Sequence, residues 1–225
     1  MDGIIILKEG GYQMSTILEA KNVSKTIKGH RILDNINFSL NKGEICGLVG
    51  RNASGKSMLF KALCGLITID SGEIRIFNDK IGKNGKFPAM TGVIIEQPGF
   101  LSQYSGYENL KLLANIQRKV GKNEIEEVLR KVGLDPKDKR PFRKYSLGMK
   151  QKLSIAQAIM ESPKLLILDE PMNNLDEESM IHIRGLLLEL HKTQQITILL
   201  SSHNSQDIEI LCNRVIQIAD GKFFS

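Results

Sequence analysis

Apolar and polar residues alternate in short runs within residues 17–44. One such run is Ile36-Asn37-Phe38-Ser39-Leu40, and turn-forming sequences interrupt the alternation at residues 28–29 and 41–43. A period of two is typical of strands that bury one face, so we expect an antiparallel sheet within residues 17–44. We expect a further strand pair and a polar hairpin at residues 71–86.

The pattern changes after this region. Residues 45–49 form an apolar run that predicts a buried strand, and the leucines of residues 58–66 recur at helical spacing. Later apolar runs at 165–168 and 197–200 predict two more buried strands, with a helical pattern over 177–191 between them. Because strands that alternate with helices typically form a parallel sheet, the chain is predicted to be an α/β protein.

The middle of the chain is predicted to be helical. Apolar residues recur at helical spacing over residues 107–133, and we place a helical insert at about 98–163. The sequence has no internal repeat or low-complexity linker, so residues 14–225 are expected to form one domain. Residues 1–13 are expected to be a non-structural leader or the product of a mis-called start, because their last codons can form a ribosome-binding sequence before Met14.

Composition narrows the possible functions. The net charge of +6 is spread along the chain without a block of like charges, so we expect no nucleic-acid partner. The apolar runs fall far short of the ~20 residues that a membrane-spanning helix needs. Three widely spaced cysteines, Cys46, Cys64 and Cys212, favour reduced thiols in the cytoplasm over a disulfide framework or a metal site.

A glycine-containing segment between the predicted strand and helix carries the clearest chemical signal. Residues 50–57 read Gly-Arg-Asn-Ala-Ser-Gly-Lys-Ser, a pattern whose backbone N–H groups surround phosphate oxygens at the positive end of a helix. We expect Lys56 to reach the terminal phosphates of ATP and the Ser57 hydroxyl to bind Mg²⁺. The residues expected to bind ATP are Gly50, Arg51, Asn52, Ala53, Ser54, Gly55, Lys56, Ser57 and Met58.

Two carboxylates end the apolar run at residues 165–168. Buried acids are costly unless a cation or a proton transfer requires them. We therefore expect Asp169 to hold Mg²⁺ through water and Glu170 to act as the general base that activates the attacking water. The alternative is that Glu170 caps the helix that follows the strand.

The segment Tyr145-Ser146-Leu147-Gly148-Met149-Lys150-Gln151 resembles the signature sequence of the nucleotide-binding subunits of ABC transporters, and the likeness covers residues 17–225. The resemblance implies a P-loop NTPase fold with a RecA-like core, an antiparallel β subdomain and an inserted α-helical subdomain. It also implies that two copies bind ATP between them. Ser146, Gly148 and Gln151 of one copy would then close over the γ-phosphate held by the other, whereas the segment read alone predicts Ser146 as a helix N-cap.

Two further positions match motifs of that family. Asp176 ends the sequence Asn174-Leu175-Asp176, which is similar to the D-loop that links the two sites. His203 follows a predicted strand, where the family has a histidine that hydrogen-bonds the γ-phosphate. The resemblance thus gives His203 a catalytic role beside Glu170 and Lys56, although a lone histidine at such a place can also be a surface or packing residue.

Three positions depart from the common family pattern. Ile27 stands where an aromatic residue usually stacks on adenine, so adenine is expected to rest on apolar contacts. Leu147 replaces the first signature glycine. Glu96, with Gln97 next to it, occupies the Q-loop position, and either side chain can face the metal. The sequence Glu96-Gln97-Pro98 and the signature segment together resemble the bacitracin-resistance and lantibiotic-immunity branch of the family.

The resemblance implies an ATPase subunit at the cytoplasmic face of the cell membrane. Such a subunit is peripheral, dimerises on ATP and powers export of an antimicrobial peptide or drug through a separate transmembrane permease subunit. We expect the permease to contact residues 100–107, whose aromatic side chains can alternatively pack the helical insert. A soluble ABC-type ATPase, for example in cluster assembly, is the alternative function. A P-loop GTPase or kinase is disfavoured because the chain lacks a guanine-binding Asn-Lys-x-Asp sequence after the phosphate loop.

Overall fold

The computed structural model describes residues 15–82, 86–96 and 99–224. Within these residues the strands are β1 (Thr16–Ile27), β2 (His30–Asn41), β3 (Ile45–Val49), β4 (Ser71–Ile76), β5 (Asp79–Ile81), β6 (Thr91–Ile94), β7 (Leu165–Asp169), β8 (Thr197–Ser201), β9 (Arg214–Ala219) and β10 (Lys222–Phe224). The helices are α1 (Lys56–Leu63), α2 (Gly106–Gln117), α3 (Lys122–Lys131), the 3-10 helix η1 (Phe142–Lys144), α4 (Leu147–Ile159), α5 (Glu177–Gln194) and α6 (Ser205–Leu211).

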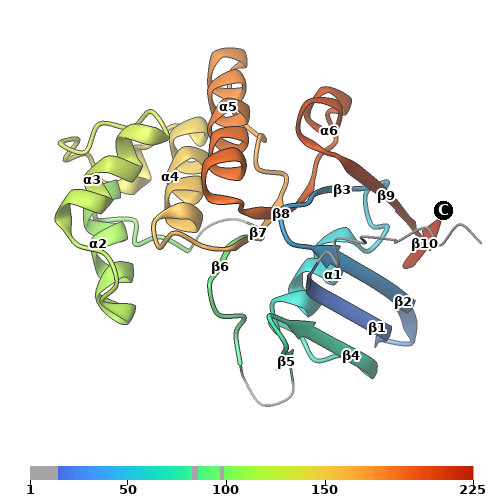
Figure 1. The fold of residues 1–225 in the computed structure, drawn as a ribbon. Helices are drawn as coiled ribbons and strands as arrows, with labels where there is room; N and C mark the ends of the chain where they lie inside the picture. Colours follow the sequence, from blue (N-terminus) through green and yellow to red (C-terminus); the bar gives the residue numbers. More distant parts are fainter. Residues whose placement is uncertain (1–14, 83–85, 97–98, 225) are drawn as a thin grey trace, which may run out of the picture.

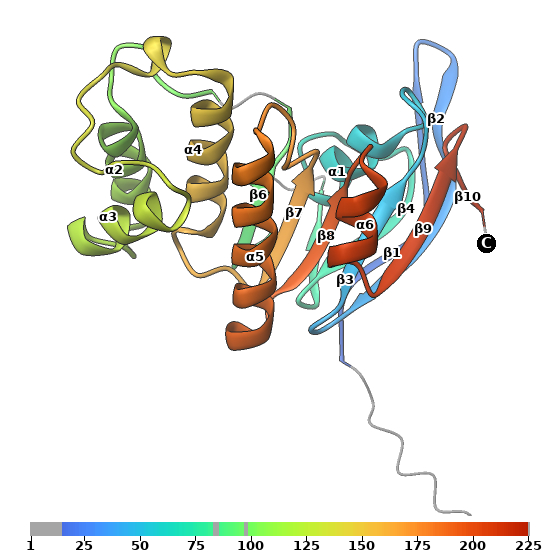
Figure 2. The same cartoon turned by 90° about the horizontal axis from the view of Figure 1, so that it is seen from above.

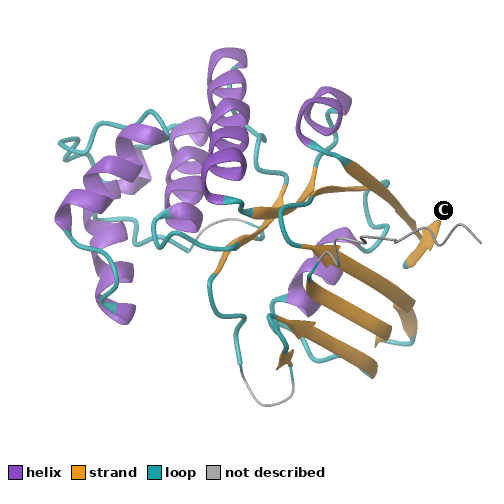
Figure 3. Cartoon of the chain, viewed as in Figure 1, coloured by secondary structure: helices purple, strands orange, loops and turns teal. Residues whose placement is uncertain are grey.

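The strands form two sheets (Figures 1 and 3). The first is antiparallel with the order β2-β1-β4-β5, and in it Ala20 of β1 pairs with Phe38 of β2 and Ile74 of β4. The second has the order β10-β9-β3-β8-β7-β6, in which β9, β3, β8, β7 and β6 are parallel and β10 is antiparallel to β9. Because β3, β7 and β8 run in one direction, the segments that follow them meet at one edge of the sheet.

Helices cover both faces of the parallel sheet (Figure 2). Helix α1 lies between the two sheets, where Phe60 and Leu63 are buried in a core shared with β1, β2 and the parallel strands. Helices α4 and α5 cover the opposite face, where Leu153, Leu187 and Leu200 belong to a second core. The central strands are therefore buried on both faces, which is why their sequences are continuously apolar rather than alternating.

Most of the sequence-based elements are confirmed. Antiparallel strands occupy residues 17–44, the three apolar runs form β3, β7 and β8, and the helical pattern over 177–191 belongs to α5. The insert between β6 and β7 contains α2, α3, η1 and α4, with Leu110 and Val128 buried as the helical pattern predicts. The limits of the domain at 14–225 and of the insert at 98–163 stay predictions.

One predicted helix end is wrong. The helix after the phosphate loop ends at Leu63, because Gly65 takes a left-handed conformation (φ +70°) that is typical of the residue after a last helical turn. Leu66 consequently lies beyond α1 and is 48% exposed instead of buried. The expected leader at 1–13 lies outside the described residues.

None of the helices in the described ranges has the length and hydrophobicity required to span a lipid bilayer.

Candidate active site

The segment between β3 and α1 lines a cavity of about 310 Å³. Asn52 to Gly55 of this segment line the cavity together with Lys56, Ser57 and Met58 in the first turn of α1. Asp169 and Glu170 reach it from the end of β7, and His203 reaches it from the end of β8. The parallel sheet therefore brings together three groups of predicted site residues that are more than 30 positions apart in the sequence.

Backbone conformation shapes the loop around this cavity. Gly55 has φ +109°, a conformation that side-chain-bearing residues rarely adopt. A Cβ atom on Gly50 would lie 2.2 Å from the carbonyl oxygen of Ile218 and 2.6 Å from the Ser54 hydroxyl, so only glycine fits there. Both glycines of the sequence pattern are thus required by the geometry of this chain as well as by the motif.

Two polar side chains, of Ser54 in the loop and of Lys56 at the start of α1, are buried at the loop. The Lys56 ammonium, whose residue is 7% exposed, donates hydrogen bonds to the carbonyl oxygens of Gly50 (2.6 Å) and Arg51 (3.1 Å). The buried Ser54 hydroxyl has no hydrogen-bond partner among the described residues. A positive charge and an unpartnered hydroxyl at the N-terminal end of α1 match the chemistry of a polyphosphate.

The acids after β7 are held by the neighbouring strand. The Ser201 hydroxyl of β8 donates to Asp169 Oδ1 (2.6 Å) and accepts from the backbone N–H of Glu170 (3.0 Å). Glu170 has φ +52°, a left-handed conformation that costs about 1 kcal/mol for a residue other than glycine. This turn directs the Glu170 carboxylate back toward β8 and does not leave it at the start of α5.

Glu170 and His203 contact each other through both the backbone and the side chain. Glu170 Oε2 accepts from the backbone N–H of His203, and Oε1 lies 3.1 Å from His203 Nε2. Burial raises the pKa of the Glu170 carboxyl above its ordinary value, while the neighbouring His203 opposes that rise. The expected alternative, in which Glu170 caps the next helix, is not what this chain does, because the Asp176 carboxylate caps α5 by accepting from Ser179 N–H (2.8 Å).

The signature segment lies apart from this cavity. Ser146 is exposed and caps α4 by accepting from the backbone N–H of Met149 (3.1 Å), as the segment read alone predicts. Gly148 packs near the carbonyl oxygen of Asn174, where a Cβ atom would lie 3.1 Å away. Ser146 and Gly148 do not line the phosphate cavity of their own chain.

Gln151 is placed differently from the other signature residues. Its Nε2 donates to the carbonyl oxygen of Pro171 (2.9 Å), directly after the acid pair. This contact joins α4 to the turn that carries Glu170. Gln151 thus acts within its own chain in this structure, and a contact with a second copy stays a prediction.

Glu96 forms an ion pair with Lys61 of α1 and does not line the phosphate cavity. It borders another cavity, of about 270 Å³, with Leu66, Phe87 and Gly99. Gln97 lies outside the described residues, so whether it faces the metal stays a prediction.

Ile27 does not line the phosphate cavity and is 37% exposed at the end of β1. Ile32 of β2 is the apolar residue of the antiparallel sheet that lines the phosphate cavity. Ile32 and Ser201 were not predicted from the sequence. A polar residue at the end of an otherwise apolar run was the available signal for Ser201, whereas nothing in the alternating pattern distinguished Ile32.

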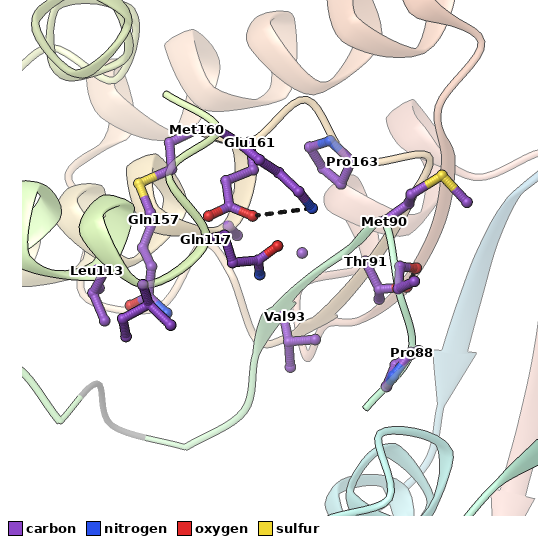
Figure 4. Close-up of a pocket in the computed structure, with 15 residues that line it drawn as sticks. Pro88, Met90, Thr91, Val93, Leu113, Gln117, Gln157, Met160, Glu161 and Pro163 are labelled. Carbon is purple, nitrogen blue, oxygen red and sulfur yellow. Dashed lines mark hydrogen bonds and ion pairs between the residues drawn. The ribbon is translucent and has the colours of Figure 1, made fainter. Parts of the chain in front are cut away.

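A further cavity, of about 330 Å³, lies at the opposite edge of the parallel sheet, where β6 begins (Figure 4). Met90 and Thr91 line it from this edge, and Gln117 near the end of α2 and Glu161 beyond α4 line it from the helical insert. The rim contains an ion pair between Lys119 and Glu161 with 4.0 Å between charged atoms. Glu161 is the one acid among the described residues that line this cavity, whereas two acids line the phosphate cavity, so we do not assign nucleotide to it.

A family model described as ABC transporter matches residues 33–173, which is more than half of the chain. The chain belongs to the ABC transporter family. The bacitracin transport ATP-binding protein BcrA of Bacillus licheniformis is 41% identical to this ABC protein over 210 residues, which cover 93% of the chain and 69% of the relative. The lantibiotic transport ATP-binding protein SrtF of Streptococcus pyogenes is 38% identical over 206 residues, 92% of the chain and 88% of the relative.

The fold of this ABC protein also matches a solved structure. A dimeric structure of MJ0796, a bacterial ABC transporter cassette, has a TM-score of 0.85 over 93% of the chain and 97% of the cassette. At 22% identity this similarity shows the fold alone. The predicted P-loop NTPase fold, the resemblance to the bacitracin and lantibiotic branch and an ATP-hydrolysing activity are thereby confirmed, and the transport ATPase is favoured over the soluble alternative.

Proposed function

We propose that this ABC ATPase hydrolyses Mg²⁺-bound ATP at the phosphate loop and powers export of an antimicrobial peptide through a separate membrane permease. The observation that supports the chemical part is the convergence of Lys56, Asp169, Glu170 and His203 on one cavity. Lys56 would neutralise the terminal phosphates, and the backbone of Gly50 to Ser57 would hold them.

Ser57 and Asp169 would hold Mg²⁺. Both residues line the phosphate cavity, and Asp169 uses one carboxylate oxygen for Ser201, which leaves the other without a hydrogen bond to any described residue. Two protein oxygens suit a cation that keeps several of its own waters. When bound, Mg²⁺ supplies positive charge to the phosphate oxygens, and these two side chains fix where that charge lies.

Glu170 would accept a proton from the attacking water. Its raised pKa brings the carboxylate closer to the pH at which a base both stays ionised and accepts a proton well. The two contacts with His203 hold the carboxylate in one orientation. The half-exposed His203 imidazole would hydrogen-bond the γ-phosphate and respond to its loss.

A second copy of the chain would complete the site. Ser146 and Gly148 lie outside the cavity of their own chain, and the backbone N–H groups at the start of α4 form a positive helix end suited to phosphate. In a head-to-tail dimer these groups reach the γ-phosphate bound by the other copy, with the Asp176 turn beside Gly148 at the contact. ATP then stabilises the dimer and hydrolysis releases it.

The permease would dock beside Glu96. Leu66 and Phe87, 48% and 67% exposed, border the cavity next to this residue, and Leu101 and Tyr104 are exposed directly after it. Several exposed apolar side chains near one site are typical of a protein interaction surface. Phe100 and Tyr107, by contrast, pack against the core of the helical insert, and Phe100 stacks edge-on against Phe142.

The names of the relatives support peptide antibiotics as substrates. BcrA is a bacitracin transport protein and SrtF is a lantibiotic transport protein, and each aligns with more than nine-tenths of this chain. We therefore propose that the transporter exports such peptides, with the ATPase bound peripherally at the cytoplasmic face of the membrane.

Deletion of the gene in its native host tests the transport function. The deletion strain should become more sensitive to bacitracin or to a lantibiotic, and its sensitivity to an antibiotic with an intracellular target should not change. Wild-type protein should restore resistance, whereas the Glu170→Gln variant at equal abundance should not. Unchanged sensitivity to both peptide classes would contradict the proposed substrate class.

A further inference from the structure

A buried polar cluster lies behind the loop that carries His203. Asp207 of α6 is 1% exposed, and its carboxylate accepts hydrogen bonds from Arg184 Nε (2.7 Å) and from the Ser202 hydroxyl (2.5 Å). Arg184 comes from α5 and is 7% exposed. The cluster therefore ties two helices, which lie on the same face of the sheet, to the residue directly before His203.

The two serines at the end of β8 have opposite partners. Ser201 bonds Asp169 and the backbone of Glu170, whereas Ser202 bonds Asp207 and accepts from the backbone N–H of Asn204 (3.0 Å). Successive side chains in an extended segment point to opposite sides, so Ser201 and His203 face the acids while Ser202 faces the helices. The loop is thus fixed from both sides.

The cost of this arrangement indicates a role beyond stability. Removing the charges of Arg184 and Asp207 from water costs free energy that offsets most of their mutual attraction. Apolar residues of equal volume often stabilise a core as well as such an ion pair does. A directional hydrogen-bond network, unlike an apolar contact, fixes the place of the atoms that it joins. The atom fixed here is the Ser202 hydroxyl, one residue from an imidazole that is half exposed and contacts only one carboxylate in the described chain.

We propose that Arg184, Asp207 and Ser202 are positioning residues that hold His203 against Glu170 and thereby set the rate of ATP hydrolysis. The proposal rests on the catalytic role proposed above for His203. Displacing a catalytic group by about 1 Å can reduce turnover by up to about a hundredfold. Loss of the cluster should therefore lower kcat with little effect on KM for ATP, because the phosphate loop does not contact the cluster.

The decisive variant replaces the ion pair by apolar residues, Arg184→Met with Asp207→Leu, in the full-length chain. We expect its melting temperature to stay near that of the wild type. Its kcat should fall at least about tenfold, and KM for Mg²⁺-ATP should stay within about twofold. A folded double variant with wild-type kcat would overturn the proposal, as would a change in KM alone.

Ser202→Ala provides a second measurement that does not disturb the ion pair. It should lower kcat in the wild-type chain but have no further effect in a His203→Ala chain, because the serine acts through that imidazole. Equal effects in both backgrounds would contradict positioning of His203. If His203→Ala alone leaves kcat unchanged, the proposed role of His203 fails as well, so the two failures are distinguishable.

A matched control uses an ion pair at the opposite end of the parallel strands, where they begin. Glu44 and Arg214 lie 3.1 Å apart where β3 and β9 begin, away from the His203 loop. Glu44→Gln should lower the melting temperature without changing kcat. An equal loss of kcat in this control would overturn the proposal, because it would attribute the effect to general destabilisation.

Discussion

The phosphate loop and the signature segment are the two halves of the proposed site, and the fold builds them in different ways. Lys56, Asp169 and His203 come from three distant segments that the parallel sheet brings to one edge, and Ser201 fixes the acids from the neighbouring strand. Ser146 is exposed at the start of α4, where its hydroxyl accepts a hydrogen bond from a backbone N–H of the same helix. The first half is assembled within one chain, whereas the second, in the proposed dimer, would present a helix end to the other copy.

Glu170→Gln should produce the largest change, because it removes the proposed base from the assembled half. Loss of a general base typically lowers turnover by about 10²–10⁴-fold. Binding of ATP should persist, since Lys56 and the loop backbone are untouched. Size-exclusion chromatography with Mg²⁺-ATP should therefore show a lasting dimer for the variant. Normal ATPase activity would contradict the assignment of Glu170 as the base.

Ser146→Asp separates the local role of the signature serine from its proposed role in the dimer. Aspartate is as good an N-cap as serine, so thermal stability should be retained. Its negative charge would face the γ-phosphate of the second copy, so ATPase activity should fall by at least about tenfold. Ser146→Ala is the reciprocal control, because loss of the cap should cost about 1 kcal/mol of stability. An active Ser146→Asp variant would argue against contact with phosphate.

Tyr104→Glu tests the docking surface near Glu96. The exposed side chain should tolerate the charge, so we expect ATP binding to be unchanged and co-purification with the permease to be lost. Tyr104 is a cleaner position than Phe100, which packs against Phe142. Ile181→Glu is the control, because Ile181 is also exposed but lies on α5. Equal loss in both variants, or in neither, would refute docking at this surface.

The rate at which thiols react measures how closed each half of the site is. It is the smallest of the expected effects. Burial raises the pKa of Cys46 in β3 and of Cys64, the residue directly after α1, from 9.0 to about 12. Both thiols should therefore react slowly with a thiol reagent at pH 8, whereas a cysteine in a Ser146→Cys variant should react quickly. Rapid labelling of Cys46 or Cys64 without unfolding would show that the phosphate half is not closed.

The same thiols predict a loss of stability in alkali. In the unfolded chain they ionise near pH 9, but in the folded chain they stay protonated until about pH 12. The unfolded state therefore binds fewer protons in this range, and the free energy of unfolding should fall as pH rises from 9 to 12. Chemical denaturation at several pH values measures this slope.

The phosphate half of the site could be predicted from the sequence wherever it follows a continuous pattern. An apolar run, a glycine loop and a helical pattern give β3, the loop and α1 in order, and Asp169 and Glu170 follow a second run. The hydrogen bonds that hold these two acids were not predictable, because Asp169 and Ser201 are 32 positions apart and no periodicity links them. Leu66 was misplaced because helical spacing was given more weight than the C-terminal signal of Gly65.

Mixing two inactive variants tests the central claim most directly. Lys56→Ala inactivates the phosphate loop and Ser146→Asp inactivates the signature, so each homodimer should be inactive. In a mixed head-to-tail dimer, the intact loop of one copy meets the intact signature of the other. Random mixing then gives one intact site in half of the dimers, and activity should recover to about a quarter of the wild-type rate. A mixture as inactive as its components would contradict a site shared between two copies.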